Sequence, residues 1–345
     1  MPHDLERKLG NLRIAEPEEH VATPGEIFQP IDIAEARAKL ALVLNLAAQA
    51  FEAGRPAVET VDQLVRRLHQ LRRQSPAEVW QELIPLAQKH PVADYLLQDP
   101  FTRWSFEKPR GYPGDAGLLD IYYKHASARP IIAASTALGQ EIYSYSSEVA
   151  SAVAGRERRD ILAATVDEVS ERVDRAEILS IACGHLREAE LSKALAEGKL
   201  GRWVGLDQDP ISVGMVARDY GAMGVSAIDG NVRGILRRTY KLGTFDLVYA
   251  SGLYDYLPRP VGVRLLQRAV ELVKPGGVFL FANFSDEITS DGYMETFMDW
   301  PLILRSADDM WDIITSAVDR NDYDVDVYYG TNRDIVYGKL QKKTA

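Results

Sequence analysis

The chain has 345 residues, 46% of them hydrophobic, and a formal net charge of −10. This length predicts more than one structural unit with ample core material. No apolar run approaches the roughly 20 residues of a membrane-spanning helix, and the first residues lack the apolar stretch of a secretory signal, so we expect a cytoplasmic protein without membrane insertion. The single cysteine, Cys183, excludes an intrachain disulfide and argues against a cysteine-based metal site. The negative charge argues against nucleic acid as a partner.

The first half of the chain is predicted to be helical. Residues 1–30 show little periodicity and are interpreted as an N-terminal arm. Helix-start signals follow at Ile33, at the Thr60 and Gln63 pair, which is spaced as a capping box, and at Ser75 with Pro76 and Glu78. Further helical pattern covers residues 131–154 and 159–173, with Gly155 between them. We therefore predict a helical lid or substrate domain over residues 31–173, which includes the segment 108–115.

The second half is predicted to be an α/β domain over residues 174–345. Short β-rich runs alternate with helical segments at residues 178–182, 203–206, 225–228, 245–250 and 278–282. Strands separated by helices indicate parallel βαβ units with right-handed crossovers. Two more strand-like runs, at residues 323–329 and 334–340, are expected to form an antiparallel pair at the sheet edge. The prediction is a Rossmann-like domain with a mostly parallel seven-stranded sheet.

Several polar residues and glycines follow the predicted strands, where open α/β sheets bind their ligands. Gly184, after the first strand, would let the backbone pass close to a ligand. Asp207 ends the second strand roughly 20 residues later and is placed to accept hydrogen bonds from a ribose diol. Asp229 ends the third strand, where its carboxylate could accept a hydrogen bond from an adenine amino group. Together these residues predict a nucleoside site.

This ordered set resembles the class I S-adenosylmethionine (SAM) dependent methyltransferases. The resemblance implies that Ala182 and Gly184 contact the methionine part of SAM, that Asp207 holds the ribose, and that Asp229 meets the adenine. The Lys-Pro-Gly-Gly turn at residues 274–277 is also frequent in that family. On this basis SAM is the expected cofactor, and the expected cofactor site also includes Tyr112, Gln208, Gly230, Asn231 and Ser251.

The segment 108–115, Lys-Pro-Arg-Gly-Tyr-Pro-Gly-Asp, combines turn formers, charge and an aromatic residue. It is interpreted either as an ordered functional loop or as a simple linker. Together with residues 180–184 and 252–257 and with Asn283 and Phe284, it resembles bacterial methyltransferases grouped with 3-hydroxypalmitic acid methyl ester synthases. That narrower resemblance implies a helical lid over the SAM pocket and a small-molecule acceptor, a carboxylate or another small nucleophile, as in secondary metabolism.

The acceptor is expected beyond the fourth and fifth strands. The candidate substrate-binding residues are Arg110, Tyr254, Asn283, Phe284, Tyr293 and Arg305. The candidate catalytic residues are Tyr254, Asp255, Tyr256 and His185. An arginine can hold a carboxylate with two parallel bonds, and tyrosine rings attract a sulfonium through cation–π interaction. A carboxylate acceptor needs little proton transfer, whereas an amine or hydroxyl needs a base such as His185, Asp255 or His125.

Two other functions remain open from the sequence. One is a cyclase or aminocarboxypropyl transferase that uses the amino acid arm of SAM and releases methylthioadenosine, an idea motivated by the departure from the usual glycine-rich turn at His185 and Leu186. The other is a SAM-binding regulator without turnover. The sequence also leaves the oligomeric state open.

Overall fold

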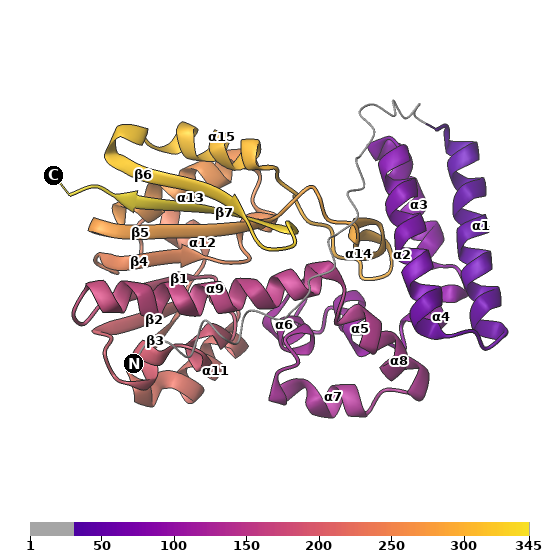
Figure 1. Ribbon diagram of the computed structural model, residues 1–345, viewed down its shortest axis with the longest axis horizontal. Helices are drawn as coiled ribbons and strands as arrows, with labels where there is room; N and C mark the ends of the chain where they lie inside the picture. Colours follow the sequence, from indigo (N-terminus) through magenta and orange to yellow (C-terminus); the bar gives the residue numbers. More distant parts are fainter. Residues whose placement is uncertain (1–30, 345) are drawn as a thin grey trace, which may run out of the picture. The chain divides into compact units, whose positions relative to one another are not determined.

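The computed structural model describes residues 31–344, and its α/β part is built on a seven-stranded sheet (Figure 1). The strand order is β3-β2-β1-β4-β5-β7-β6. The strands are β1 (Glu177–Ile181), β2 (Arg202–Asp207), β3 (Val225–Asp229), β4 (Phe245–Ala250), β5 (Val273–Phe284), β6 (Tyr323–Tyr329) and β7 (Ile335–Lys342). Strands β1 to β5 pair in parallel, and β7 runs antiparallel to both β5 and β6. The predicted parallel units and the antiparallel pair are therefore confirmed, while the predicted arm lies outside the described residues.

Both faces of the sheet are covered by helices. The helices α9 (Ala150–Arg172) and α11 (Pro210–Tyr220) pack on one face, and α12 (Val232–Leu236), α13 (Arg259–Glu271) and α15 (Ala307–Ala317) pack on the other (Figure 1). Every residue of β4 is buried, as expected of a central strand whose sequence is almost continuously hydrophobic. Burial of both faces leaves the ends of the strands as the places where a ligand can reach them.

The remaining helices precede the sheet or connect its strands. They are α1 (Ile33–Glu52), α2 (Ala57–Gln74), α3 (Ala77–Gln88), α4 (Val92–Leu96), α5 (Pro100–Glu107), α6 (Ala116–Tyr122), α7 (Arg129–Ala133), α8 (Ala137–Ser146), α10 (Lys193–Ala196) and α14 (Asp291–Thr296). Although α14 follows β5 in the chain, it packs against α2 and α3. Its Asp291 lies 2.6 Å from His69 Nδ1, and its Glu295 accepts hydrogen bonds from Arg72 and Trp80. The group of helices that precedes the sheet thus also contains α14, a segment from the second half of the chain. The domain boundary predicted after residue 173 stays a prediction.

Two predicted helix caps are wrong. Helix α2 begins at Ala57, and the Thr60 hydroxyl donates to the carbonyl of Pro56 from inside the helix. The Ser75 hydroxyl donates to the carbonyl of Leu71, so it satisfies the end of α2 instead of capping α3. A short hydroxyl side chain can bond either to a following amide or to the carbonyl four residues before it, and the spacing alone does not distinguish the two.

Gly155 does not interrupt the helical pattern, because α9 runs through it without a break. A Cβ atom at this position would lie 2.7 Å from Cε2 of Tyr122 and 2.9 Å from its hydroxyl oxygen. The glycine therefore permits a close contact between α9 and the tyrosine ring of α6.

We expect Gly155→Ala to lower the free energy of unfolding by about 1–3 kcal/mol, because the added methyl group overpacks the contact with Tyr122. Gly214→Ala in α11 is the matched control, since a Cβ there meets no atom within 4 Å. An alanine at that exposed helical position should stabilise the protein by about 0.5–1 kcal/mol. Urea unfolding measures both changes, and equal changes of one sign would contradict the packing argument.

Candidate active site

A cleft of about 470 Å³ lies at the carboxyl ends of β1, β2 and β4. This volume falls within the range of small-molecule sites. The sequence-predicted residues that line it are Tyr112, Ala182, Gly184, His185, Asp207, Gln208, Gly230, Asn231, Ser251 and Tyr256. Residues that lie far apart in the chain are thus brought to one place by the parallel strands and by the segment 108–115.

Asp207 is buried at the end of β2 and is held by two backbone amides. Its Oδ2 accepts a hydrogen bond from the Gly184 amide at 2.7 Å, and its Oδ1 accepts one from the Asp209 amide at 2.9 Å. Burial raises the pKa of the Asp207 carboxyl, whereas these amide bonds lower it. Asp229 is paired beside Asp207 in the sheet register, but its side chain is exposed and does not line the cleft.

The turn after β1 has an unusual backbone. Ala182, Gly184 and Leu186 all have positive φ, at 56°, 52° and 52°. For alanine and leucine this left-handed conformation is uncommon and costs energy, and such positions concentrate at functional sites. A Cβ atom at Gly184 would lie 3.2 Å from Cβ of Ala116, so the start of α6 packs directly against this turn.

The segment 108–115 is an ordered loop between α5 and α6. Asp115 caps α6 by accepting from the Gly117 amide at 2.7 Å, and Arg110 crosses to α11, where it donates to Asp209 at 2.6 Å. Burial and the nearby carboxylates of Asp207 and Asp209 raise the pKa of the Tyr112 hydroxyl. The helical region therefore contributes one wall of the cleft, as expected of a lid, while Arg110 itself does not line the cleft.

His185 is engaged at both ring nitrogens. Its Nε2 lies 2.9 Å from Nη2 of Arg110, and because a guanidinium only donates, Nε2 is the acceptor. The ring then carries its proton on Nδ1 and donates it to Asp120 at 2.9 Å. Burial raises the pKa of Asp120, but hydrogen bonds from Arg187 and His185 outweigh it and hold this pKa below its usual range. His185 thus ties the loop to the sheet, and neither nitrogen is free to accept a proton.

Tyr254 and Tyr256 have opposite orientations on the short 3₁₀ helix η4 (Tyr254–Tyr256). Tyr256 lines the cleft, and its hydroxyl accepts a hydrogen bond from Trp300 Nε1 at 2.7 Å. Tyr254 is fully buried beneath the sheet, where its ring packs against Phe281 with the centroids 4.5 Å apart. Of the two candidates, the cleft therefore contains only Tyr256.

Arg305 and Asn283 are buried and hold the loop after β4. Arg305 donates to the carbonyls of Tyr254, at 2.6 Å, and Leu257, and also to the Asn283 side chain. Asn283 in turn donates to the carbonyl of Ile303 at 2.7 Å. Neither side chain lines the cleft. Their polar groups bond to carbonyls of the surrounding loops instead.

Asp255 is buried next to this loop. Its Oδ1 accepts from the Phe284 amide at 2.6 Å, and its Oδ2 lies 3.7 Å from Nη1 of Arg158. Burial raises the pKa of the Asp255 carboxyl to about 6, against the attraction of Arg158 and the amide bond.

This pKa predicts a pH dependence of stability. The folded protein keeps the Asp255 proton to a higher pH than the unfolded chain, so the free energy of unfolding falls as pH rises from about 4 to about 6. We expect Asp255→Asn to remove this fall, which amounts to about 2–3 kcal/mol between pH 4 and pH 7. Urea unfolding at stepped pH measures it. Asp326→Asn, at an exposed position of β6, should follow the native profile, and a native profile for Asp255→Asn would refute the prediction.

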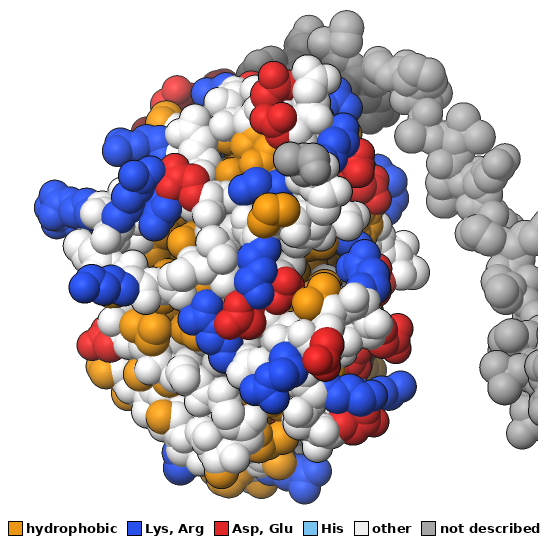
Figure 2. All heavy atoms as spheres, turned by 90° about the vertical axis from the view of Figure 1, so that its left-hand side faces the viewer, with side chains coloured by type: hydrophobic (Ala, Val, Ile, Leu, Met, Phe, Trp, Pro, Cys, Tyr) orange, Lys and Arg blue, Asp and Glu red, His pale blue; other side chains and the backbone are white. Residues whose placement is uncertain are grey.

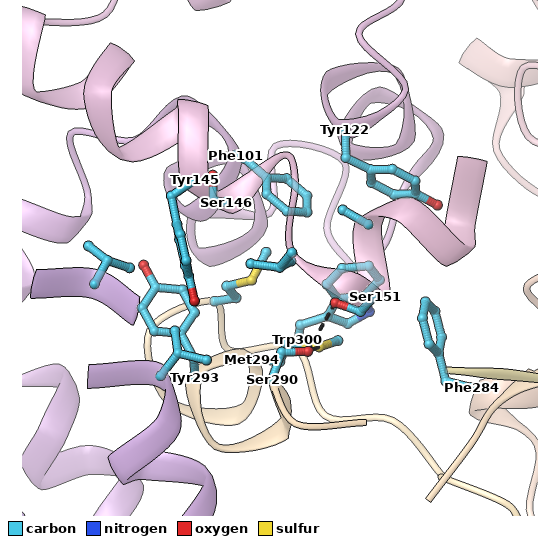
Figure 3. A pocket seen from close by; sticks show the side chains of 15 residues that line it. Phe101, Tyr122, Tyr145, Ser146, Ser151, Phe284, Ser290, Tyr293, Met294 and Trp300 are labelled. Carbon is cyan, nitrogen blue, oxygen red and sulfur yellow. Dashed lines mark hydrogen bonds between the residues drawn. The ribbon is translucent and has the colours of Figure 1, made fainter. Parts of the chain in front are cut away.

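Phe284 and Tyr293 line a second cavity that is separate from the cleft (Figure 3). It lies among α2, α5, α8, α9 and α14 and is almost entirely apolar, with Phe101, Tyr122, Met294 and Trp300 in its walls. Its volume of about 30 Å³ is close to the share of one water molecule in the liquid. In this conformation it does not admit an acceptor. His125, the other candidate base, contacts Ser127 and Glu190 and lines neither cavity.

Five further polar residues of the cleft have no recognisable signal in the sequence. They are Asp120, Tyr123, Arg158, Arg187 and Glu188. The first three lie in helical segments or directly after one, and the last two belong to the short 3₁₀ helix η2 (Arg187–Glu190) after the glycine turn. Only the tertiary packing of these helices shows that their side chains reach the cleft.

Residues 31–344 hold neither a cluster of potential metal ligands nor a membrane-spanning helix. On the face drawn in Figure 2, Lys and Arg side chains are interspersed with Asp and Glu. In residues 31–344, no group of three or more His, Cys, Asp or Glu side chains could hold a metal ion. Across the same residues, no helix is both long and apolar enough to span a bilayer.

No protein-family model and no curated protein matches this chain. Among solved structures, it is similar to a protein described as a possible exported protein from Bordetella parapertussis, with a TM-score of 0.53 and 16% identity over 90% of this chain and 97% of the other. It is also similar to the N-methyltransferase NodS from Bradyrhizobium japonicum, with a TM-score of 0.41 and 16% identity over 57% and 90% of the two chains. The plantazolicin methyltransferase BamL gives 0.44 and 9% over 70% and 98%. The likeness to the first of these structures concerns the fold alone. The strand order and the helices that precede the sheet confirm the predicted Rossmann-like sheet with an N-terminal helical region.

Proposed function

We propose that the chain is a cytoplasmic SAM-dependent methyltransferase that acts on a small-molecule acceptor. The observation that carries this proposal is the position of Asp207, a buried carboxylate at the end of β2 that lines the cleft. Each of its oxygens accepts one backbone amide and keeps a lone pair for a ribose hydroxyl. An acid at the end of the second strand is the usual ribose ligand of dinucleotide-binding α/β folds.

The rest of the cleft agrees with an adenosyl ligand. In this proposal, Gly230 and Asn231 contact the adenine, Ala182 and Gly184 contact the methionine part, and Tyr112 covers the ligand from the loop. The exposed side chain of Asp229 accepts a hydrogen bond from the adenine amino group at the edge of the cleft. The group supplied by SAM is an activated methyl, so the protein's own contribution is to bind, orient and exclude water.

A carboxylate is the acceptor that best suits the site. It is one of the acceptors implied by the narrower resemblance, which also allows another small nucleophile. A carboxylate is already ionised, so no proton has to be removed. His185 donates and accepts within the protein, which leaves it unsuited as a base. Tyr256, on the loop after β4, is the candidate that orients the acceptor.

The test is to incubate the purified full-length chain with SAM and a panel of carboxylic acids and to quantify the nucleoside products. Acceptor-dependent formation of S-adenosylhomocysteine supports the proposal. Methylthioadenosine would instead indicate a cyclase or aminocarboxypropyl transferase. Binding of SAM without any product would indicate a regulator.

A further inference from the structure

We propose that Arg158 and Glu188 bind the two charged ends of the amino acid arm of SAM, with Arg158 at the carboxylate and Glu188 at the ammonium. This assignment rests on the proposed function and deepens it. It names binding residues that no motif of the sequence indicates.

Arg158 is a buried guanidinium that makes few hydrogen bonds, although it lies over the ring of Phe284 and near the carboxylate of Asp255. It is 2% exposed and lines the cleft. Of its five N–H donors, one makes a hydrogen bond, from Nη1 to the Ser251 carbonyl at 3.3 Å. The carboxylate of Asp255 lies beyond hydrogen-bond distance, at 3.7 Å, and Nε is buried without a partner among the described residues. Buried N–H donors that make no hydrogen bond are costly even beside one carboxylate, so an anionic ligand group in the cleft would stabilise this side chain.

Glu188 is the complementary group. It is 7% exposed and lines the same cleft, and its Oε1 accepts a hydrogen bond from the Tyr249 hydroxyl at 2.6 Å. Its Oε2 receives no hydrogen bond from any residue between 31 and 344. Burial raises the pKa of Glu188, and the positive charge of Arg158 acts in the opposite direction. A ligand ammonium next to Oε2 would favour the ionised carboxylate and use its free oxygen.

The sheet order places this charge pair where the arm would lie. Strand β1 lies between β2 and β4, so the turn after β1 adjoins both Asp207 and the loop that begins at Ser251. With the ribose at Asp207, a ligand that extends across β1 reaches the region of Glu188 and Arg158. An α-amino acid group carries one positive and one negative charge, and the two protein side chains match both signs.

The experiment compares three ligands by calorimetry on the full-length protein. Decarboxylated SAM keeps the ammonium but lacks the carboxylate, and 5′-methylthioadenosine lacks the whole amino acid arm. We expect Arg158→Met to weaken SAM binding by about 10- to 100-fold and to leave the other two ligands unchanged. Glu188→Gln should weaken both SAM and decarboxylated SAM by about tenfold and leave methylthioadenosine unchanged.

Arg172→Met is the matched control, because Arg172 lies on the same helix in an exposed ion pair with Glu168. It should bind all three ligands like the native protein. Native affinity for methylthioadenosine also shows that each variant is folded. If Arg158→Met does not fold, Arg158→Lys is measured instead, with the same selective loss expected because lysine lacks the guanidinium fork.

The assignment is overturned if Arg158→Met keeps native SAM affinity, or if it weakens methylthioadenosine as much as SAM. Native SAM affinity with a raised KM for a carboxylic acid acceptor would assign Arg158 to the acceptor instead. If the native protein binds neither SAM nor methylthioadenosine, the proposed function itself fails. These results differ, so the assignment of Arg158 and Glu188 can be rejected without rejecting SAM as the cofactor.

Discussion

Asp207→Ala should lower the affinity for SAM by about a hundredfold or more. The substitution removes a carboxylate that would accept two ribose hydrogen bonds, each worth about 1.5–3 kcal/mol when the acceptor is charged. It also leaves the buried amides of Gly184 and Asp209 without their acceptor, which loosens the turn at the cleft. Isothermal titration calorimetry with SAM and with methylthioadenosine measures the loss, which should be similar for both ligands because both contain the ribose.

Two variants calibrate this result. Asp207→Asn keeps one acceptor oxygen and should show an intermediate loss, whereas Asp326→Asn on the exposed edge strand β6 should bind like the native protein. Full affinity of Asp207→Ala for SAM would contradict the proposed site.

Trp80→Ala should lower the free energy of unfolding by about 3–5 kcal/mol. Trp80 is fully buried in α3, and its indole N–H donates to Glu295 of α14. Alanine would leave a cavity. It would also remove one of the two hydrogen-bond donors of the buried Glu295 carboxylate, which would then accept a hydrogen bond from Arg72 alone. Urea unfolding followed by circular dichroism measures the change, and loss of the contact between α3 and α14 should be its main structural consequence.

Trp311→Ala is the control of the same residue type. Trp311 is half-buried in α15, and its ring stacks under Arg320 at 4.6 Å. Removal of this partly exposed side chain should cost about 1 kcal/mol. If both substitutions lowered the free energy of unfolding by similar amounts, the contact between Trp80 and α14 would contribute no more to stability than the exposed contact of Trp311.

The sequence alone determined the order and type of the main elements. Strands β4 and β6 were predicted with the bounds that the structure has, because short runs rich in aromatic and β-branched residues favour a strand over a helix. Asp207 and Gly184 were predicted from their spacing, since the carboxyl ends of neighbouring parallel strands must lie side by side. Helix starts were less determinate, as Thr60 and Ser75 show, because a hydroxyl can bond the carbonyl four residues before it instead of a following amide.

Only the tertiary structure decided which polar side chains reach the cleft. Tyr254 and Tyr256 are two residues apart, yet a 3₁₀ turn directs one into the core and the other to the cleft. Arg110 and Arg305 have the chemistry of anion ligands, but carboxylates, His185 and loop carbonyls occupy their donors. Arg158 has the same chemistry, but only one of its donors makes a hydrogen bond within the described residues, and its side chain lines the cleft. A residue's type determines what it can bind, but the packing around it determines whether that capacity is already used.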